Sequence, residues 1–338
     1  MPSKSEQQLS KYRQRIATAS AVVALVTGHF AGLTSAAAQS NFPSRQILLV
    51  IPFAPGGTGD IVGRMLAERL TVALGRSVVV ENRAGASGSI GARSVATATP
   101  DGHTLLVGQT GEIAITPNWG KGTGYHPDRD LAPVALATVV PLALVSPAKS
   151  GFKSVADLVA AAQGKPMSFA SSGTGTPGHF AGELLKLRTK SDMAHVPYKG
   201  AGLALNDLLG GHVGYFFSGF PAADPHVKSG SLTLLAVSSG KRSVSAADIP
   251  SVGETRGLEG FDITLWQGIF APGGTPAEIV GKLNAEINKQ LNDPEVKAKL
   301  LAQGAEPRPL SVTEFAAFTR AEGEKFASII KEIGLPAP

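Results

Sequence analysis

Short apolar runs that alternate with helical segments constrain the fold of this chain more than any other feature. The apolar run QILLVIPF at 46–53 precedes a helical segment at 60–74, and a second apolar run follows at 77–82. A short helix at 90–97 and an apolar run at 103–108 continue the order. The order β-α-β-α-β is typical of a parallel sheet with crossover helices. We therefore predict an α/β fold.

The same alternation starts again after residue 147. It predicts helices at 154–163, 178–188 and 202–209, strands at 167–171, 194–198, 213–218 and 232–239, and C-terminal helices near 276–291, 294–303 and 312–332. Two strands, near 134–145 and 232–239, lead into and out of this second unit. We predict a first domain at 39–143 plus 239–338, with a second domain, 144–238, inserted into it. A cleft between two such units suits a small ligand.

Residues 1–38 have the three parts of a secretory signal peptide. Four lysines and arginines precede a mostly apolar stretch at 16–33, and an A-x-A pattern at 36–38 precedes the mature chain. The alternative is a membrane anchor, but polar and small residues at 27–29 interrupt the stretch, which is poorly suited to crossing roughly 30 Å of hydrocarbon. We predict cleavage after Ala38 and a periplasmic location.

Charge and cysteine content limit the possible partners. Residues 1–38 hold four of the 31 basic and one of the 26 acidic residues, so the remainder has 27 basic and 25 acidic residues and a net charge of +2. This balance predicts no nucleic-acid partner. The chain has no cysteine, which excludes disulfides and a lipoprotein anchor. A mature chain of about 300 residues buries enough surface without them, and we predict a monomer.

Two similar glycine-rich turns occupy corresponding places in the two predicted units. FAPGGTG lies at 53–59 and FASSGTG at 169–175, so the pattern FA-x-x-GTG recurs 116 positions later. Each turn precedes a predicted helix, whose first amides lack partners and lie at the positive end of the helix dipole. Neither turn contains Lys or Arg. We predict that the two turns face one cleft and hold a carboxylate mainly through backbone amides.

Simpler roles for these residues stay open. A glycine turn before a helix is often only a tight connection. Asp60 can cap its helix or pair with Arg64 four residues on, and His179 can lie at the surface or behind the ligand. The hydroxyl residues can act as helix caps or as ligand contacts: Ser171, Ser172, Thr174 and Thr176.

Nucleotide binding and catalysis have little support. Gly173, Gly175 and Gly178 spell the dinucleotide pattern G-x-G-x-x-G, but Pro177 interrupts it and Asp192 does not end a second strand. No G-x-S-x-G elbow occurs, and the seven histidines show no close pair of the metal-binding type. We predict no cofactor, no metal and no enzyme activity. An exported α/β hydrolase that uses a loop serine stays an alternative.

Four longer segments carry a family resemblance: IPFAPGGTGDIVGRMLAERL, VVVENRAGASGSIGARSVATATPDGHTLLVG, HVPYKGAGLALNDLLGGHVGYFFSG and LNAEINKQLNDPEVKAKLLAQGAEP. They resemble the Bug-type extracytoplasmic solute receptors, the substrate-binding proteins of tripartite tricarboxylate transporters. The resemblance implies a two-domain, type II-like Venus flytrap of the periplasmic-binding-protein kind, in which each domain is a mixed, mainly parallel sheet flanked by helices. It also implies a small organic carboxylate as ligand, delivered to the membrane permease subunits of the transporter without catalysis.

The turns that hold the carboxylate in this family match 53–60 and 171–179. Thr110 and Gly111 follow a strand of the first unit, at the sheet edge where ligands bind in open α/β folds, and Tyr198 ends a strand of the second. Glu112 is left out, because its charge could repel an anion. The candidate ligand-binding residues are Phe53, Ala54, Gly56, Gly57, Thr58, Asp60, Thr110, Gly111, Ser171, Ser172, Gly173, Thr174, Gly175, Thr176, His179, Tyr198 and Ser218.

The sequence departs from the family pattern near the expected ligand. Gly59 stands where threonine is common, and Gly214 and Ser218 replace acidic residues. The aromatic residues nearby can supply stacking surface or belong to the core and rim: Trp119, Phe216, Phe217 and Phe220. A dicarboxylate, an amino acid and an aromatic acid all stay open as ligands. A role in sensing, coupled to a membrane signalling protein, stays an alternative to transport.

Overall fold

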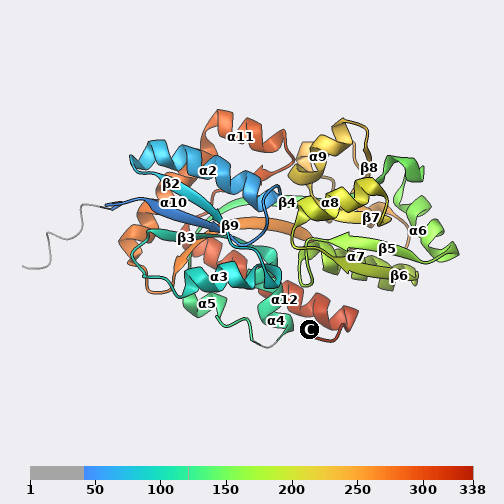
Figure 1. The fold of residues 1–338 in the computed structure, drawn as a ribbon, viewed down its shortest axis with the longest axis horizontal. Coiled ribbons are helices and arrows are strands. Elements are labelled where there is room, and N and C mark those ends of the chain that lie inside the picture. Colours follow the sequence, from blue (N-terminus) through green and yellow to red (C-terminus); the bar gives the residue numbers. More distant parts are fainter. Residues whose placement is uncertain (1–41, 121, 338) are drawn as a thin grey trace, which may run out of the picture. The chain divides into compact units, whose positions relative to one another are not determined.

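Two groups of parallel strands are joined through two antiparallel central strands, β9 and β4 (Figure 1). The computed structural model describes residues 42–120 and 122–337. Its described strands form one ten-stranded network in the order β2-β1-β3-β9-β4-β7-β5-β6, and β8 and β10 also pair with β4. The predicted signal peptide, 1–38, lies outside the described residues.

The first group confirms the predicted β-α-β-α-β order. β1 pairs in parallel with β2 and with β3, and α2 and α3 form the crossovers. These elements are β1 (Ile47–Ile51), α2 (Thr58–Leu74), β2 (Val78–Asn82), α3 (Ser89–Ala96) and β3 (Thr104–Gln109). Ile47, Leu49 and Ile51 of β1 are almost fully buried, which is typical of a strand inside a parallel sheet.

The second group repeats this arrangement. β5 pairs in parallel with β6 and with β7, as the second alternation of apolar runs predicts. Its elements are α6 (Val155–Gly164), β5 (Met167–Ser171), α7 (Pro177–Thr189), β6 (Met193–Pro197), α8 (Ala201–Gly210), β7 (Tyr215–Gly219), α9 (Phe220–Lys228) and β8 (Leu232–Val237). Phe169 and Tyr215 are fully buried between the strands and helices of this group.

β4 (Leu131–Pro147) joins the two groups. Its first part, 131–141, pairs with β9 (Thr264–Pro272), and its second part, 142–147, pairs with β7 and β8. β8 pairs with β4 only, so the crossing predicted at 232–239 ends earlier than expected. After β8, the Ser238 amide donates to the carbonyl of Leu142 in β4, and the Ser238 carbonyl accepts from the Ile263 amide. No continuous strand leads from β8 to the first group among the described residues. The predicted boundaries of the inserted domain, 144–238, stay a prediction.

The remaining elements connect and cover the sheet. They are η1 (Ala86–Gly88), η2 (Gly111–Ile115), α4 (Thr116–Trp119), α5 (Pro127–Asp130), η3 (Ala148–Ser150), η4 (Val244–Ala246), η5 (Val252–Glu254), α10 (Ala277–Asn292), α11 (Pro294–Leu301), β10 (Glu306–Pro307) and α12 (Val312–Ile333). α12 contacts both η2 and α7, and Arg188 of α7 pairs with Glu332 of α12 at 3.2 Å. The C-terminal helix thus touches both strand groups.

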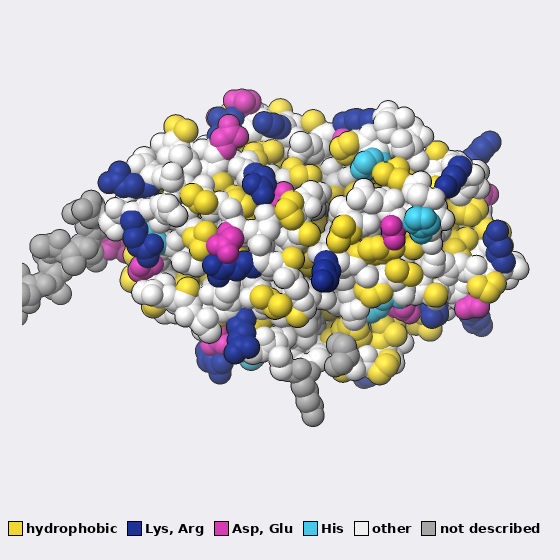
Figure 2. Space-filling view, in the orientation of Figure 1, with side chains coloured by type: hydrophobic (Ala, Val, Ile, Leu, Met, Phe, Trp, Pro, Cys, Tyr) yellow, Lys and Arg dark blue, Asp and Glu magenta, His cyan; other side chains and the backbone are white. Residues whose placement is uncertain are grey.

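The surface carries dispersed charge. Basic and acidic side chains are interspersed on the face shown in Figure 2, with apolar side chains between them. Across the described ranges, no helix combines the length and the apolar character that a membrane crossing requires.

Candidate ligand-binding site

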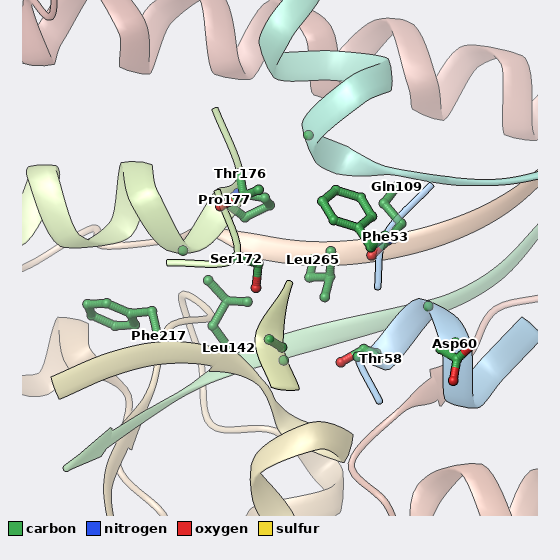
Figure 3. Close-up of a pocket in the computed structure, with 16 residues that line it drawn as sticks. Phe53, Thr58, Asp60, Gln109, Leu142, Ser172, Thr176, Pro177, Phe217 and Leu265 are labelled. Atoms are coloured by element: carbon green, nitrogen blue, oxygen red, sulfur yellow. The ribbon is translucent and has the colours of Figure 1, made fainter. Parts of the chain in front are cut away.

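A small cavity lies where the β1–α2 loop, the β5–α7 loop and the central strands meet (Figure 3). Its volume is about 40 Å³. The loops contribute Gly57, Thr58, Gly59, Asp60, Ser172, Thr176, Pro177 and Gly178, and the surrounding elements contribute Phe53, Gln109, Gly111, Leu142, Ala201, Phe217, Gly219 and Leu265. The two glycine-rich turns therefore face one cavity.

The β1–α2 loop presents the start of a helix to this cavity. Gly56 adopts a left-handed φ of 85°, a conformation that favours glycine, and α2 begins directly after its N-cap residue Gly57. The first amides of α2, those of Thr58 and Gly59, have no acceptor within the helix. With the helix dipole behind them, these amides form a suitable site for an anion.

Asp60 holds this loop from behind. Its carboxylate accepts hydrogen bonds from the Gly56 amide at 3.1 Å, Asn82 Nδ2 at 2.9 Å and Arg64 Nε at 3.0 Å. Burial alone would raise the pKa of Asp60, but the hydrogen bonds from Arg64, Asn82 and Gly56 outweigh burial and lower it. In Figure 3 the carboxylate points away from the cavity. Of the roles open from sequence, pairing with Arg64 is the one observed.

Thr58 brings a buried hydroxyl to the cavity. Its Oγ1 has no hydrogen-bond partner among the described residues. A Cβ at Gly219, at the end of β7, would lie only 2.0 Å from this oxygen, and a Cβ at Gly59 would lie 2.7 Å from Gln109 Nε2. The two glycines therefore allow β7 and β3 to approach the loop closely. Because an unpaired buried hydroxyl is costly, Thr58 is suited to hydrogen-bond a ligand.

The β5–α7 loop is held by its own side chains. Ser171 Oγ accepts from the Gly173 amide at 3.1 Å, and Thr176 Oγ1 donates to the Gly173 carbonyl at 2.7 Å. The Gly175 amide donates to His179 Nδ1 at 3.2 Å. Ser172 is half-buried and lies at the cavity wall (Figure 3). Its hydroxyl is the side chain of this loop best placed to reach a ligand.

Two stacked histidines support this loop from the side away from the cavity. The rings of His179 and His195 are 4.0 Å apart, and His195 Nε2 lies 2.6 Å from Ser171 Oγ. Burial, and then the charge of the other histidine, lowers the pKa of His179 to about 3; burial, and then Lys186, lowers the pKa of His195 to about 4. Both rings are therefore neutral at neutral pH.

The contact between Ser171 and His195 has the spacing of a nucleophile and its base. Ser171 is fully buried, however, and does not line the cavity. Its hydroxyl is also occupied by both the amide and the carbonyl of Gly173. A substrate has no route to this oxygen in the observed arrangement, so the geometry gives the hydrolase alternative no support.

Glu112 lies behind the cavity, in η2. It is fully buried, and its Oε1 accepts a hydrogen bond from the Gln109 amide at 2.6 Å. Burial raises the pKa of Glu112 to about 8. The carboxyl group is therefore mostly protonated at neutral pH, and it does not line the cavity. The expected repulsion between Glu112 and an anionic ligand is absent for this reason.

The structure divides the predicted site residues into three sets. Those at the cavity wall are Phe53, Gly57, Thr58, Asp60, Gly111, Ser172 and Thr176. Gly173, Thr174 and Tyr198 line a neighbouring cavity of about 240 Å³, which also includes Phe53, Ser172 and Lys199. Outside both walls are Ala54, Gly56, Thr110, Ser171, Gly175, His179 and Ser218.

The residues outside both walls have structural partners instead. Thr110 Oγ1 accepts a hydrogen bond from the Trp266 amide at 2.9 Å, and Ser218 Oγ donates to the carbonyl of Gly219 at 3.2 Å. Ser171 and His179 hold the β5–α7 loop, as described above. These residues do not line the two cavities in this structure, and their part in ligand binding stays a prediction.

The sequence analysis missed several residues of the wall. Gln109 ends β3, directly before the predicted Thr110, so the strand-end rule could have included it. Leu142 and Leu265 lie in long apolar strands and have no local signal that separates them from the core. Of the four aromatic residues weighed, Phe217 is at the wall, whereas Phe216 is fully buried elsewhere. Within 42–120 and 122–337, no group of three or more acidic or histidine side chains is placed to hold a metal ion.

Comparison with known proteins identifies the family. The model of the tripartite tricarboxylate transporter family receptor matches residues 62–335. The chain belongs to this receptor family. The receptor is 35% identical to the protein BugT of Bordetella pertussis over 307 residues. The aligned region covers 90% of this chain and 94% of BugT. This finding confirms the predicted resemblance to Bug-type solute receptors.

Solved structures confirm the predicted fold class of the receptor. Rpa4515 of R. palustris, solved with adipate, superposes with a TM-score of 0.85 at 34% identity, over 87% of this chain and 99% of that one. MatC of Rhodopseudomonas palustris, solved with malate, superposes with a TM-score of 0.80 at 32% identity, over 86% and 100%. The receptor therefore has the α/β periplasmic-binding-protein fold, and its family is one of solute-binding receptors.

Proposed function

We propose that this receptor captures a small organic carboxylate in the cavity between the β1–α2 and β5–α7 loops. The observation that carries the proposal is the approach of two helix starts to one cavity, with the unpaired Thr58 hydroxyl at the start of α2. None of the described residues at the cavity wall is Lys, Arg or His. The amides and hydroxyls would then hold the anion, as helix N-termini commonly do.

The wider role follows from the family. In this proposal the receptor works in the periplasm, the segment 144–238 closes on the rest of the chain around the ligand, and the closed form delivers the ligand to the permease subunits of a tripartite tricarboxylate transporter. Two similar structures were solved with the carboxylates adipate and malate, which supports this ligand class. The absence of enzyme activity is part of the same proposal.

A substitution at Gly57 tests the site. Gly57 has φ of −84°, and a Cβ there would meet no atom closer than 3.9 Å, so the backbone accepts a side chain. In Gly57→Asp, the new carboxylate would cap α2 and occupy the amides intended for the ligand. We expect a raised Tm for the free protein and no further rise with any member of a panel of mono- and dicarboxylates that stabilises the unmodified protein.

Two controls accompany this test. Gly57→Ala adds bulk without charge and should keep part of the ligand-induced rise in Tm. Gly281→Asp places the same charge in α10, where a Cβ meets nothing within 4 Å, and should keep all of it. A ligand-induced rise in Gly57→Asp equal to that of the unmodified protein would contradict the proposed site.

A further inference from the structure

Gln109 places an unpaired carboxamide at the cavity. It ends β3 and is only 7% exposed, and its side chain lines the cavity wall (Figure 3). Its backbone amide donates to Glu112 Oε1 at 2.6 Å, but no described residue forms a hydrogen bond with its side chain. A buried carboxamide without a partner is costly, so it indicates a bond to a ligand or to water.

Other buried polar side chains of the wall are occupied. Thr176 Oγ1 donates to a carbonyl of its own loop at 2.7 Å, and the Asp60 carboxylate accepts from Arg64 Nε at 3.0 Å. Thr58 Oγ1 has no partner among the described residues. Of the buried side chains at the described wall, Thr58 and Gln109 therefore keep hydrogen-bonding groups free for a ligand.

Gly59 brings the start of α2 against the Gln109 carboxamide. A Cβ at Gly59 would lie 2.7 Å from Gln109 Nε2 and 3.3 Å from Oε1, so the carboxamide packs on the Gly59 backbone. The Gly59 amide is one of the first amides of α2, which have no acceptor within the helix. A carboxylate bound to this amide would therefore have the Gln109 carboxamide beside it.

The chemistry of a carboxamide determines which ligand completes its bonding. The group has an NH₂ that donates and an oxygen that accepts, whichever way it is turned. A carboxylate only accepts hydrogen bonds, so it can bond to the NH₂ and to the loop amides but not to the oxygen. A hydroxyl or ammonium group on the carbon next to the carboxylate would supply the missing donor.

We infer that Gln109 selects carboxylates that carry a hydrogen-bond donor on the adjacent carbon, as 2-hydroxy acids and 2-amino acids do. The inference rests on the proposed function, since the amides of α2 hold the carboxylate. Gln109 Oε1 accepts from the donor, and Gln109 Nε2 and Thr58 Oγ1 donate to the carboxylate. A site of this kind rejects an analogue that lacks the donor, because the buried oxygen is then left unpaired.

Gln267 is the competing partner for Gln109. The two residues lie opposite each other in the pairing of β3 with β9, and Gln267 Nε2 also has no partner among the described residues. Gln267 Oε1 accepts from Thr138 Oγ1 at 2.6 Å, inside the core. If Gln109 only supported this core pair, its loss would change the affinity for all ligands by the same factor.

Matched ligands test the inference on the unmodified protein. Isothermal titration calorimetry at neutral pH would compare lactate and alanine with propionate, and malate and aspartate with succinate. In at least one set, we expect the hydroxy or amino acid to bind about tenfold more tightly, or better, than the acid without the donor. A smaller ratio in both sets, as would result if water bonded to the Gln109 oxygen, overturns the inference.

A substitution assigns the preference to Gln109. Gln109→Met keeps an unbranched side chain and removes its donors and its acceptor. We expect it to weaken the donor-bearing ligand about tenfold and to leave the matched acid within about threefold. Gln163→Met, at an exposed site in α6, should keep the preference. Equal losses for both ligands in Gln109→Met would show a structural role and overturn the inference.

Gly59→Ala tests the same contact from the other side. The new Cβ would overlap the Gln109 carboxamide, which would have to move away from the start of α2. We expect a loss of the preference, with no further loss when Gln109→Met is added. Gly281→Ala in α10, where a Cβ meets nothing within 4 Å, should keep the preference. If Gln109→Met does not fold, a preference kept in Gly59→Ala overturns the inference.

Gly57→Asp separates the failure of the inference from that of the proposed function. Carboxylates that bind without the preference, and that lose binding in Gly57→Asp, would keep the site and overturn the inference alone. Binding of no carboxylate in the two sets, or binding that Gly57→Asp leaves intact, would overturn both.

Discussion

The two glycine-rich turns reach the same cavity, but their shared letters occupy different structural positions. In the first turn, Phe53 follows the end of β1 and Thr58 is the first residue of α2. In the second, Phe169 lies inside β5, and Thr174 lies three residues before α7. The motifs are 116 residues apart (174 − 58), whereas the N-cap residues Gly57 and Thr176 are 119 apart (176 − 57). The start of the helix, and not the repeated pattern, defines equivalent positions.

The turns also differ in what holds them. One carboxylate, that of Asp60, fixes the first turn and leaves the amides of α2 and the Thr58 hydroxyl free for a ligand. The second turn uses its own hydroxyls and His179 as internal partners, and Pro177 at the start of α7 has no N–H to offer. We therefore expect the first turn to supply more of the ligand contacts than the second, whose polar groups are occupied by one another.

Matched substitutions in the two turns should show the largest difference in ligand affinity. Thr58 is 4% exposed and Ser172 is half-buried, so a hydrogen bond to a carboxylate is worth more at Thr58. We expect Thr58→Val to weaken ligand binding about tenfold, which corresponds to about 1.4 kcal/mol, and Ser172→Ala to weaken it only about threefold. Titration calorimetry with the tightest ligand of the panel would measure both.

Stability provides the control for Thr58. Its hydroxyl has no partner in the free protein, so Thr58→Val should not lower the free energy of unfolding, and Thr58→Ser should keep the affinity within a fewfold of the original. Equal losses of affinity in Thr58→Val and Ser172→Ala would contradict the expectation that the first turn contributes more to ligand binding than the second.

A smaller effect, confined to the second turn, is a dependence of stability on pH. The pKa of His179 is about 3 and that of His195 about 4 in the folded protein, both below the ordinary value for histidine. Between that ordinary value and these lowered values, the unfolded chain binds protons that the folded protein does not. Stability should therefore fall as the pH falls from about 6.5 to 4.

Denaturant unfolding across this pH range would test the assignment. His195→Gln should make the dependence shallower than in the unmodified protein. Burial raises the pKa of Glu183, which makes the folded protein more stable as the pH falls. This contribution is present in both the variant and the unmodified protein, so it cancels in their comparison. An identical slope in His195→Gln would show that the histidine pair does not titrate on unfolding.

The order of elements could be predicted from the sequence because apolar runs and helical periodicity are local signals. The run at 46–53 contains β1, and the helix expected at 178–188 lies within α7. The single strand over 131–147 was predicted only in part, since its ends depend on pairing with β9 and β8. The strand at 232–239 was predicted to lead back to the first group, whereas β8 pairs with β4. An apolar run carries no information about which strand it will pair with.

The site could be predicted less completely for the same reason. A glycine turn before a helix is visible in the sequence, so Gly57, Thr58 and Ser172 were included. The apolar residues of the cavity wall could not be predicted in this way: Leu142 and Leu265 resemble core residues, and they reach the cavity through the antiparallel pairing of β4 with β7 and with β9. The internal partners of Ser171 and His179 were also out of reach, because each depends on the folded path of one loop.

A crystal structure of the receptor with the tightest ligand of the panel tests the central claim most directly. The account predicts the ligand carboxylate within about 3 Å of the amides of Thr58 and Gly59 and of the Thr58 hydroxyl. Ser172 should contact the ligand from the β5–α7 loop, and the body of the ligand should contact Leu142 and Leu265. A carboxylate bound to Lys199, with the amides of α2 left to water, would contradict it.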